Sequence, residues 1–171
     1  ITVQSSCPPF NFFEGAELQA KHNEWRLFHG VSPEACRMIC RSNFNLGHAG
    51  MGGTWKDEGD AWGMPLYGFG IYFAEHITKA DEYAMPDPDD PGIFGVLLCR
   101  VIGGRTNVVT DPAIDPNILE SQVLDGPYHS VFGDRVTVQK KPYREVMIYD
   151  RSQIYPEFLV SYRRRYAKPP R

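Results

Sequence analysis

Apolar and polar positions along the chain predict a protein built mainly from short β-strands. Residues 93–102 (IFGVLLCRVI) are almost continuously apolar, which is typical of a strand buried on both faces in the middle of a sheet. Residues 144–149 (REVMIY) and 157–163 (EFLVSYR) alternate β-branched and aromatic side chains with others, so they predict the last two strands of that sheet. Shorter strands are expected at 25–30 and at 71–74.

Helices are predicted between some of these strands. Residues 14–25 (EGAELQAKHNEW) are rich in helix formers. Ser32 followed by Pro33 is a typical helix start, with serine as the N-cap and proline at the first position. A helix is therefore expected over 33–41, with an apolar face formed by Ala35, Met38 and Ile39. One or two helical turns are expected over 76–83.

Two regions of the sequence show little periodicity. Residues 105–143 predict a short strand near 107–109, a loop rich in Pro and Asp, and a strand with a turn within 128–135. Residues 45–67 are rich in glycine, and a loop of this length inside a compact domain is usually functional or disordered. We expect a loop that covers the substrate, with a disordered insert as the alternative. Pro156 is expected in the turn between the last two strands.

A pair of glycines precedes the strand predicted at 71–74, and two tyrosines flank the unit that follows. Tyr72 and Tyr83 lie at opposite ends of this strand-to-helix unit. Two aromatic rings across a short gap can hold a flat heteroaromatic ligand, each contributing about 0.5–1.5 kcal/mol. Tyrosine in a strand more often packs in a core, which is the alternative. A dinucleotide-binding Rossmann motif is excluded, because Gly68 and Gly70 precede the strand and no third glycine follows.

Composition and charge limit the function classes. With 171 residues, the chain is long enough for one domain with a substantial core. The net charge of −3 argues against a surface that binds nucleic-acid phosphates, although the end of the chain is locally basic. No apolar run reaches the roughly 18 residues of a membrane-spanning helix, so no membrane partner is expected.

The four cysteines are scattered along the chain. They form no C-x-x-C pair, which argues against a zinc site and against a dense disulfide framework. Cys36 and Cys40 are one helical turn apart and could share a metal with a histidine, but no further ligands show the required spacing. We therefore expect no metal. Free thiols fit an intracellular compartment, cytoplasmic or nuclear.

Three sequence blocks lie on separate predicted strands: 27–30 (LFHG), 70–74 (GIYFA) and 143–150 (YREVMIYD). Together they resemble the catalytic domain of poly(ADP-ribose) polymerase-like, diphtheria-toxin-type ADP-ribosyltransferases, which is marked by a histidine, a tyrosine and a glutamate on separate strands. The resemblance implies an α+β fold with a split, mixed and antiparallel sheet and a few short helices. It divides the chain into an N-terminal extension with a helix, the catalytic domain and a basic tail: 1–24, 25–165 and 166–171.

The resemblance also implies an activity, transfer of ADP-ribose from NAD to proteins, including possible automodification, with release of nicotinamide. It places His29 on the adenosine-side ribose of NAD and Gly30 on the nicotinamide amide. Tyr72 and Tyr83 would sandwich the nicotinamide ring, and Glu145 would be the catalytic carboxylate at the nicotinamide ribose. Glu145, His29 and Tyr72 are the implied catalytic set. Further positions implied for cofactor binding are Gly70, Ala74 and a donor-site loop at 47–66.

A single carboxylate is chemically sufficient for this reaction. Cleavage between nicotinamide and ribose passes through an oxocarbenium-like state, which a nearby carboxylate stabilises. Nicotinamide leaves as a neutral molecule, so the second carboxylate of a glycosidase is unnecessary. The same carboxylate can orient an acceptor hydroxyl. The structural alternative for Glu145 is an exposed strand-edge glutamate or a salt bridge with Arg144.

The chain departs from the family pattern at Ala80, Val31 and Phe69. Ala80 replaces a serine hydroxyl that bonds the nicotinamide carboxamide, a loss of roughly 1 kcal/mol. Glu145 is compatible with chain elongation, whereas residues 154–160 (IYPEFLV) resemble the mono-ADP-ribosylating branch, which we favour. The alternatives are poly(ADP-ribose) synthesis, a catalytically weak module that binds NAD or ADP-ribose, and an NAD hydrolase or RNA-directed transferase on the same fold.

Overall fold

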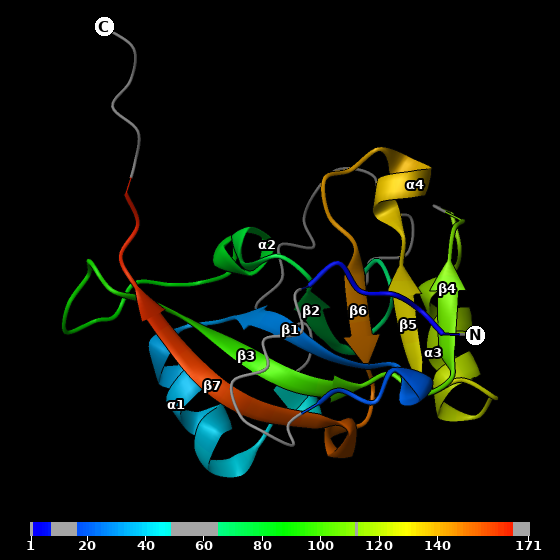
Figure 1. Ribbon diagram of the computed structural model, residues 1–171, viewed down its shortest axis with the longest axis horizontal. Coiled ribbons are helices and arrows are strands. Elements are labelled where there is room, and N and C mark those ends of the chain that lie inside the picture. Colours follow the sequence, from blue (N-terminus) through cyan, green and yellow to red (C-terminus); the bar gives the residue numbers. More distant parts are fainter. Residues whose placement is uncertain (1, 8–16, 49–64, 112, 166–171) are drawn as a thin grey trace, which may run out of the picture.

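The computed structural model of the protein describes residues 2–7, 17–48, 65–111 and 113–165, and within them seven strands form one mixed sheet (Figure 1). The strand order is β4-β5-β6-β2-β1-β3-β7. The strands are β1 Glu24–Gly30, β2 Ile71–Ala74, β3 Phe94–Ile102, β4 Thr106–Val109, β5 Ser130–Gly133, β6 Glu145–Ile148 and β7 Ile154–Tyr162. β4 and β5 are parallel, and all other neighbouring pairs are antiparallel.

The sheet is nearly divided in two between β1 and β2. These strands share a single Cα pair, Phe28 with Ala74, whereas β1 pairs with β3 along its whole length. Figure 1 shows β1, β3 and β7 running across the view while β2, β6, β5 and β4 run steeply. The expected α+β fold with a split, mixed sheet is therefore confirmed. The seam lies beside the segments that carry the predicted site.

Short helices connect the strands, and the described ones are α1 Pro33–Ser42, α2 Ile77–Asp81, α3 Pro116–Leu124 and α4 Arg135–Gln139. The start of α1 is as predicted, because the Ser32 hydroxyl accepts a hydrogen bond from Ala35 N at 3.2 Å and Pro33 is the first residue. α3 begins in the same way with Asp115 and Pro116. No helix of the described residues has both the length and the apolar composition to cross a bilayer.

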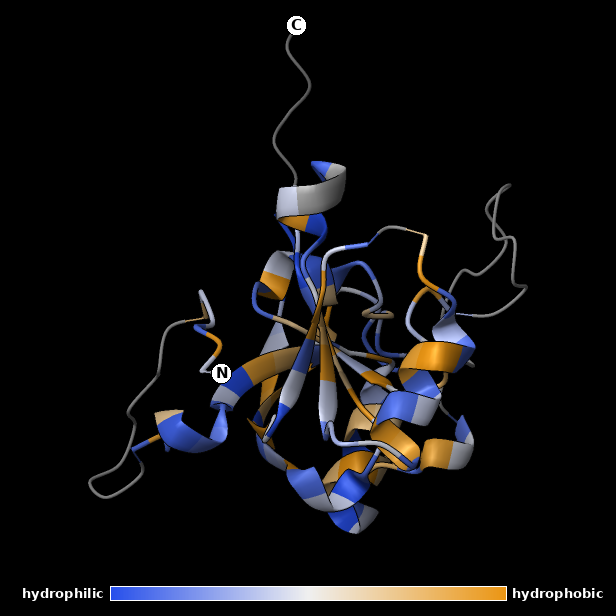
Figure 2. Cartoon of the chain, turned by 90° about the vertical axis from the view of Figure 1, so that its right-hand side faces the viewer, coloured by the Kyte–Doolittle hydropathy of each residue, from blue (hydrophilic) through white to orange (hydrophobic). Residues whose placement is uncertain are grey.

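Two groups of buried side chains form the core. The larger lies along β1, β2, β3 and β6 and includes Leu27, Phe73 and Val96, and the smaller lies under α3 and includes Leu119 and Met147. Figure 2 shows hydrophobic residues gathered along the strands at the centre and hydrophilic residues on outlying turns. The segment 93–102, predicted as a strand buried on both faces, is β3 and lies between β1 and β7.

The helix predicted over 14–25 is wrong in its described part. Residues 20–22 form a single 3₁₀ turn, and β1 begins at Glu24. Asn23 ends the turn in the left-handed region at φ 51°. Its side chain accepts a hydrogen bond from Val3 N and donates one to Gly104 O, both at 2.8 Å. These long-range contacts stabilise a strand start against the helix propensity of the segment.

Other local predictions also need correction. Met38 is 52% exposed, and the fully buried residue of α1 is Cys36. α3 lies where only a loop was expected, although its Asp-Pro start resembles that of α1. Pro156 lies within β7, which is an edge strand with a register shift beside it, the setting in which a sheet tolerates proline.

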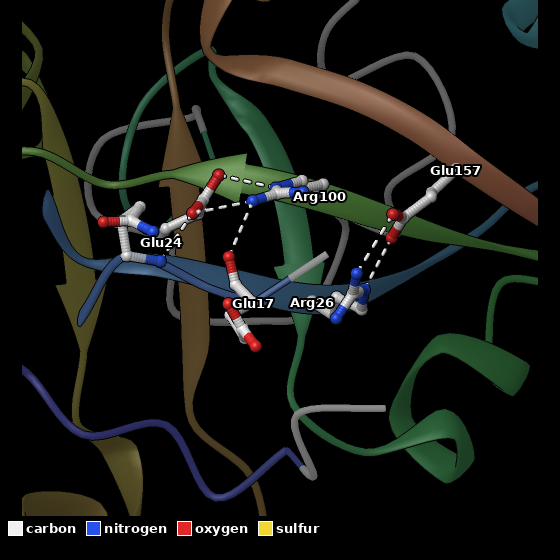
Figure 3. Close-up of polar contacts among 6 residues, drawn as sticks. Glu17, Glu24, Arg26, Arg100 and Glu157 are labelled. Atoms are coloured by element: carbon white, nitrogen blue, oxygen red, sulfur yellow. Dashed lines mark hydrogen bonds and ion pairs between the residues drawn. The ribbon is translucent and has the colours of Figure 1, made fainter. Parts of the chain in front are cut away.

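Two ion pairs hold β1, β3 and β7 in register (Figure 3). Arg26 and Arg100 are direct cross-strand partners, a pairing that is unfavourable for like charges. Each arginine has its own carboxylate: Arg26 bonds Glu157 at 2.6 and 3.1 Å, and Arg100 bonds Glu24 at 2.6 and 3.1 Å. Burial alone would raise the pKa of Glu24, but the Arg100 guanidinium and the Gln19 N–H outweigh it and lower that pKa.

Candidate active site

Three adjacent strands bring the predicted residues to one part of the sheet. In the order β6-β2-β1, β6 carries Glu145, β2 carries Tyr72 and β1 carries His29. Ala74 connects them, because its Cα pairs with Glu145 on one side and with Phe28 on the other. The structure therefore places Glu145 one strand away from Tyr72 and Tyr72 one strand away from His29.

His29 lies near the carboxyl end of β1 and is fixed by a hydrogen bond and by two aromatic contacts. Its Nδ1 lies 2.8 Å from Tyr72 O, and because a carbonyl only accepts, Nδ1 carries the proton. Phe44 and Phe73 pack against the imidazole, with ring centroids at 5.0 and 5.5 Å. Burial lowers the pKa of His29, and the hydrogen bond to Tyr72 offsets this only in part. The neutral ring therefore presents Nε2 as a hydrogen-bond acceptor, which suits a ribose hydroxyl.

Tyr72 is held by its hydroxyl. The hydroxyl donates to Gly68 O and accepts from Tyr67 N, both at 3.0 Å. Burial raises the pKa of Tyr72 well above its ordinary value, so the phenol stays protonated. A hydroxyl bonded in both directions to the backbone is poorly placed for proton transfer. The geometry therefore argues against an acid or base role for Tyr72. It is compatible with the predicted role of the ring as one wall of a nicotinamide slot, the gap between the Tyr72 and Tyr83 rings.

Tyr83, the second tyrosine predicted to flank the ligand, lies in the turn after α2 and is 38% exposed. Lys79 approaches it, with Nζ 5.0 Å from the ring centroid and 3.4 Å from the hydroxyl. Lys79 Nζ also bonds Glu82 at 2.6 Å. Burial alone would lower the pKa of Lys79, but Glu82 and Glu145 outweigh it, so the pKa is raised and the side chain is a cation.

The glycines of the site permit close packing. A Cβ on Gly30 would lie 1.8 Å from Ala80 O, so only glycine lets α2 approach β1. Ala80 is buried at this contact. A Cβ on Gly70 would lie 3.2 Å from Ile148 O and from the Tyr149 ring. Gly70, an implied cofactor-binding position, thus also permits close packing against Ile148 and Tyr149.

Glu145 is a buried carboxylate beside two cations. It is 7% exposed, its Oε2 lies 2.9 Å from Arg135 Nη1, and its Oε1 lies 3.8 Å from Lys79 Nζ. An exposed strand-edge glutamate is therefore wrong. A salt bridge with Arg144 is wrong too, because Arg144 bonds Glu75 at 2.6 and 2.8 Å. A buried carboxylate is costly unless it is paired, and Arg135 and Lys79 supply that pairing.

Sequence reasoning missed Lys79 and Arg135. Lys79 is four residues before Tyr83, a spacing that puts both on one side of a helical turn, and this could have been noticed. Arg135 lies in a region whose pattern predicted only a strand and turn. The donor-site loop at 47–66 lies largely outside the described residues. The described residues contain no group of three metal-ligating side chains, and the four cysteines form no disulfide.

Comparison with known protein families identifies the domain to which this split sheet and group of side chains belong. The chain matches the poly(ADP-ribose) polymerase catalytic domain over residues 10–164. It therefore belongs to the poly(ADP-ribose) polymerase catalytic domain family, and the resemblance seen in its sequence is confirmed.

Similar curated proteins are named as protein mono-ADP-ribosyltransferases. The chain is 28% identical to PARP12 of Mus musculus over 150 residues, which cover 86% of the chain and 18% of the relative. It is 25% identical to PARP11 of Mus musculus over 158 residues, or 82% of the chain and 42% of the relative. It is 27% identical to PARP14 of Homo sapiens over 150 residues, which cover 83% of the chain and 7% of the relative. The chain spans less than half the length of each relative.

Proposed function

We propose that this domain is an NAD-dependent protein mono-ADP-ribosyltransferase. The observation that carries the proposal is the juxtaposition of Glu145, Tyr72 and His29 on the consecutive strands β6, β2 and β1. His29 Nε2 is an acceptor suited to a ribose hydroxyl, the Tyr72 ring is a fixed wall, and Tyr83 is an exposed ring on the next turn. These features fit NAD as the co-substrate, and the proposed roles of these residues require no metal.

In the proposed reaction the bond between ribose C1′ and the nicotinamide nitrogen breaks. Its electron pair goes to nicotinamide, which leaves neutral, and positive charge develops on the ribose. The Glu145 carboxylate stabilises this charge and orients the sugar through its 2′-hydroxyl. The acceptor's lone pair then forms the new bond to C1′, and any proton that the acceptor carries passes to solvent water. Lys79 and Arg135 hold the carboxylate in place before the reaction.

Transfer of a single ADP-ribose unit is supported by the relatives, which are named as mono-ADP-ribosyltransferases. The segment 154–160 (IYPEFLV) points the same way. Acceptors are proteins, including possible automodification. An intracellular setting, cytoplasmic or nuclear, is supported by Cys7, Cys36, Cys40 and Cys99, all of which are free thiols.

A module that binds NAD or ADP-ribose with weak catalysis is the second candidate. The observation that favours it is the Arg135 contact, because the guanidinium occupies an oxygen of the carboxylate that the reaction needs. Ala80 supports it as well, because its side chain offers no hydrogen bond to a carboxamide. This candidate predicts ligand binding without nicotinamide release.

The test is incubation of the domain with NAD and a cell extract, followed by mass spectrometry of proteins and measurement of nicotinamide. We expect ADP-ribose adducts of single units that disappear in Glu145→Gln. Glu34→Gln is the matched control, because Glu34 is exposed on α1. Nicotinamide release without adducts would indicate an NAD hydrolase, and adducts with several linked units would indicate poly(ADP-ribose) synthesis. Thermal stabilisation by NAD without turnover would indicate the binding module.

A further inference from the structure

The helix α2 is short but carries much of the site. It has five residues, too few to be stable without tertiary contacts, and its N-cap residue His76 makes no side-chain capping bond. Lys79 and Ala80 lie on it, and Tyr83 follows in the turn after it. The position of the Tyr83 ring therefore depends on how the carboxyl end of α2 is held.

That end is held by Arg164, which follows β7. Arg164 Nη2 donates to Asp81 O at 2.6 Å and to Ala84 O at 3.2 Å, and Nε donates to Asp81 Oδ1 at 2.9 Å. The two carbonyls precede and follow Tyr83 in the chain. The Tyr162 hydroxyl donates to the same Asp81 oxygen. One guanidinium thus spans the turn that presents the ring.

The guanidinium itself is fixed by stacking. Arg164 Cζ lies 3.8 Å from the centroid of the Phe94 ring, and Phe94 is the cross-strand partner of Tyr162, with ring centroids 6.1 Å apart. Planar stacking combined with hydrogen bonds in a fork suits arginine and is not reproduced by lysine. β3 and β7 therefore provide a rigid base from which Arg164 reaches α2.

We propose that Arg164 and Asp81 are positioning residues that fix Tyr83 against the nicotinamide slot, and so set affinity for the nicotinamide ring without contacting it. This inference rests on the proposed function and adds two residues, Arg164 and Asp81, that are not among the predicted site residues. It predicts an effect on the nicotinamide half of NAD alone. The ADP-ribose half depends on His29, whereas the Arg164 bonds described above go to Asp81 and Ala84, on either side of Tyr83.

The test measures two ligands by calorimetry: benzamide, which resembles the nicotinamide ring, and ADP-ribose, which lacks it. Arg164→Gln and Arg164→Lys should weaken benzamide binding about three- to tenfold, the loss of one stacking wall, and leave ADP-ribose binding unchanged. Asp81→Asn should act in the same direction. The matched control is Arg163→Gln, because Arg163 pairs with exposed Asp90, at 2.5 Å, and not with α2.

A structural role alone would weaken both ligands together and lower the melting temperature in proportion, and that result would overturn the inference. Unchanged benzamide binding would overturn it as well. In a Tyr83→Ala background, Arg164→Gln should cause no further loss of benzamide affinity, and additive losses would contradict a role through Tyr83. If Arg164→Gln does not fold, Arg164→Lys and Asp81→Asn carry the same comparison. A wild-type domain that binds neither ligand would instead refute the proposed function itself.

Discussion

Arg135 Nη1 lies 2.9 Å from Glu145 Oε2, so the first residue of α4 contacts the carboxylate proposed for catalysis. The two side chains are 23% and 9% exposed, respectively, which leaves the guanidinium partly open to solvent and the carboxylate covered. Lys79 approaches the other oxygen. A carboxylate held by two cations is firmly oriented, but the same cations oppose positive charge on a nearby ribose.

Replacement of Arg135 by glutamine should therefore raise the rate of nicotinamide release. Removing one positive charge near the oxocarbenium-like state favours it by about 1 kcal/mol in a solvent-like dielectric, which corresponds to about fivefold in rate. Steady-state assays with NAD will check this. The control is Arg37→Gln, because Arg37 pairs with Asp87 on the surface. A fall in rate as large as that of Glu145→Gln would instead assign Arg135 an essential orienting role.

His29 should make the stability of the domain depend on pH. Burial lowers its folded pKa, and unfolding restores the ordinary value of 6.5. As the pH falls below this value, His29 binds a proton in the unfolded state but not in the folded state. The free energy of unfolding therefore decreases by up to about 1.4 kcal/mol per pH unit. Above pH 6.5 both states are neutral at this residue, and the contribution is constant.

The measurement is urea unfolding between pH 5 and pH 8, compared with His29→Asn. The asparagine amide can replace Nδ1 as donor to Tyr72 O, but it does not titrate. The difference between the two proteins should grow only on the acid side. Parallel stability curves across the whole range would show that His29 does not lose its proton affinity on folding.

Gly30→Ala should disrupt the contact between β1 and α2. The new Cβ would meet Ala80 O at 1.8 Å, so the backbone must move, at a cost of about 1–3 kcal/mol or more. We expect a lower urea midpoint and weaker benzamide binding, because α2 carries the residues of the slot. Gly95→Ala on β3 is the control, since its nearest atoms lie at 3.6 Å. Equal, small losses in both variants would mean that α2 adjusts freely.

Glu157→Gln should destabilise the fold, because it removes the carboxylate that bonds Arg26 at 2.6 and 3.1 Å. The Arg26 side chain has no exposed surface, and breaking a buried ion pair from one side costs about 3–5 kcal/mol. Chemical denaturation will measure the loss. Asp90→Asn, which breaks the exposed pair with Arg163, should change the midpoint little. Replacing Arg26 and Glu157 together by apolar residues should recover part of the lost stability.

Local signals in the sequence determined several elements by themselves. The apolar run at 93–102 is β3, and the pair Ser32 and Pro33 starts α1, because burial pattern and capping involve only neighbouring residues. The Asp115–Pro116 start of α3 is an equally local signal. Motifs resembling a known family, more than periodicity, identified His29, Tyr72 and Glu145 as the residues to examine.

Tertiary structure decided where those residues meet and what surrounds them. The order β6-β2-β1 joins segments more than forty residues apart, and local pattern carries no information on which strands become neighbours. It also overrode local preference, because Asn23 and its long-range hydrogen bonds stabilise a strand start where helix formers predicted a helix. The cations beside Glu145 are Lys79 on α2 and Arg135 on α4, which are far apart in the sequence. Only the packing of the sheet brings both charges close to one carboxylate.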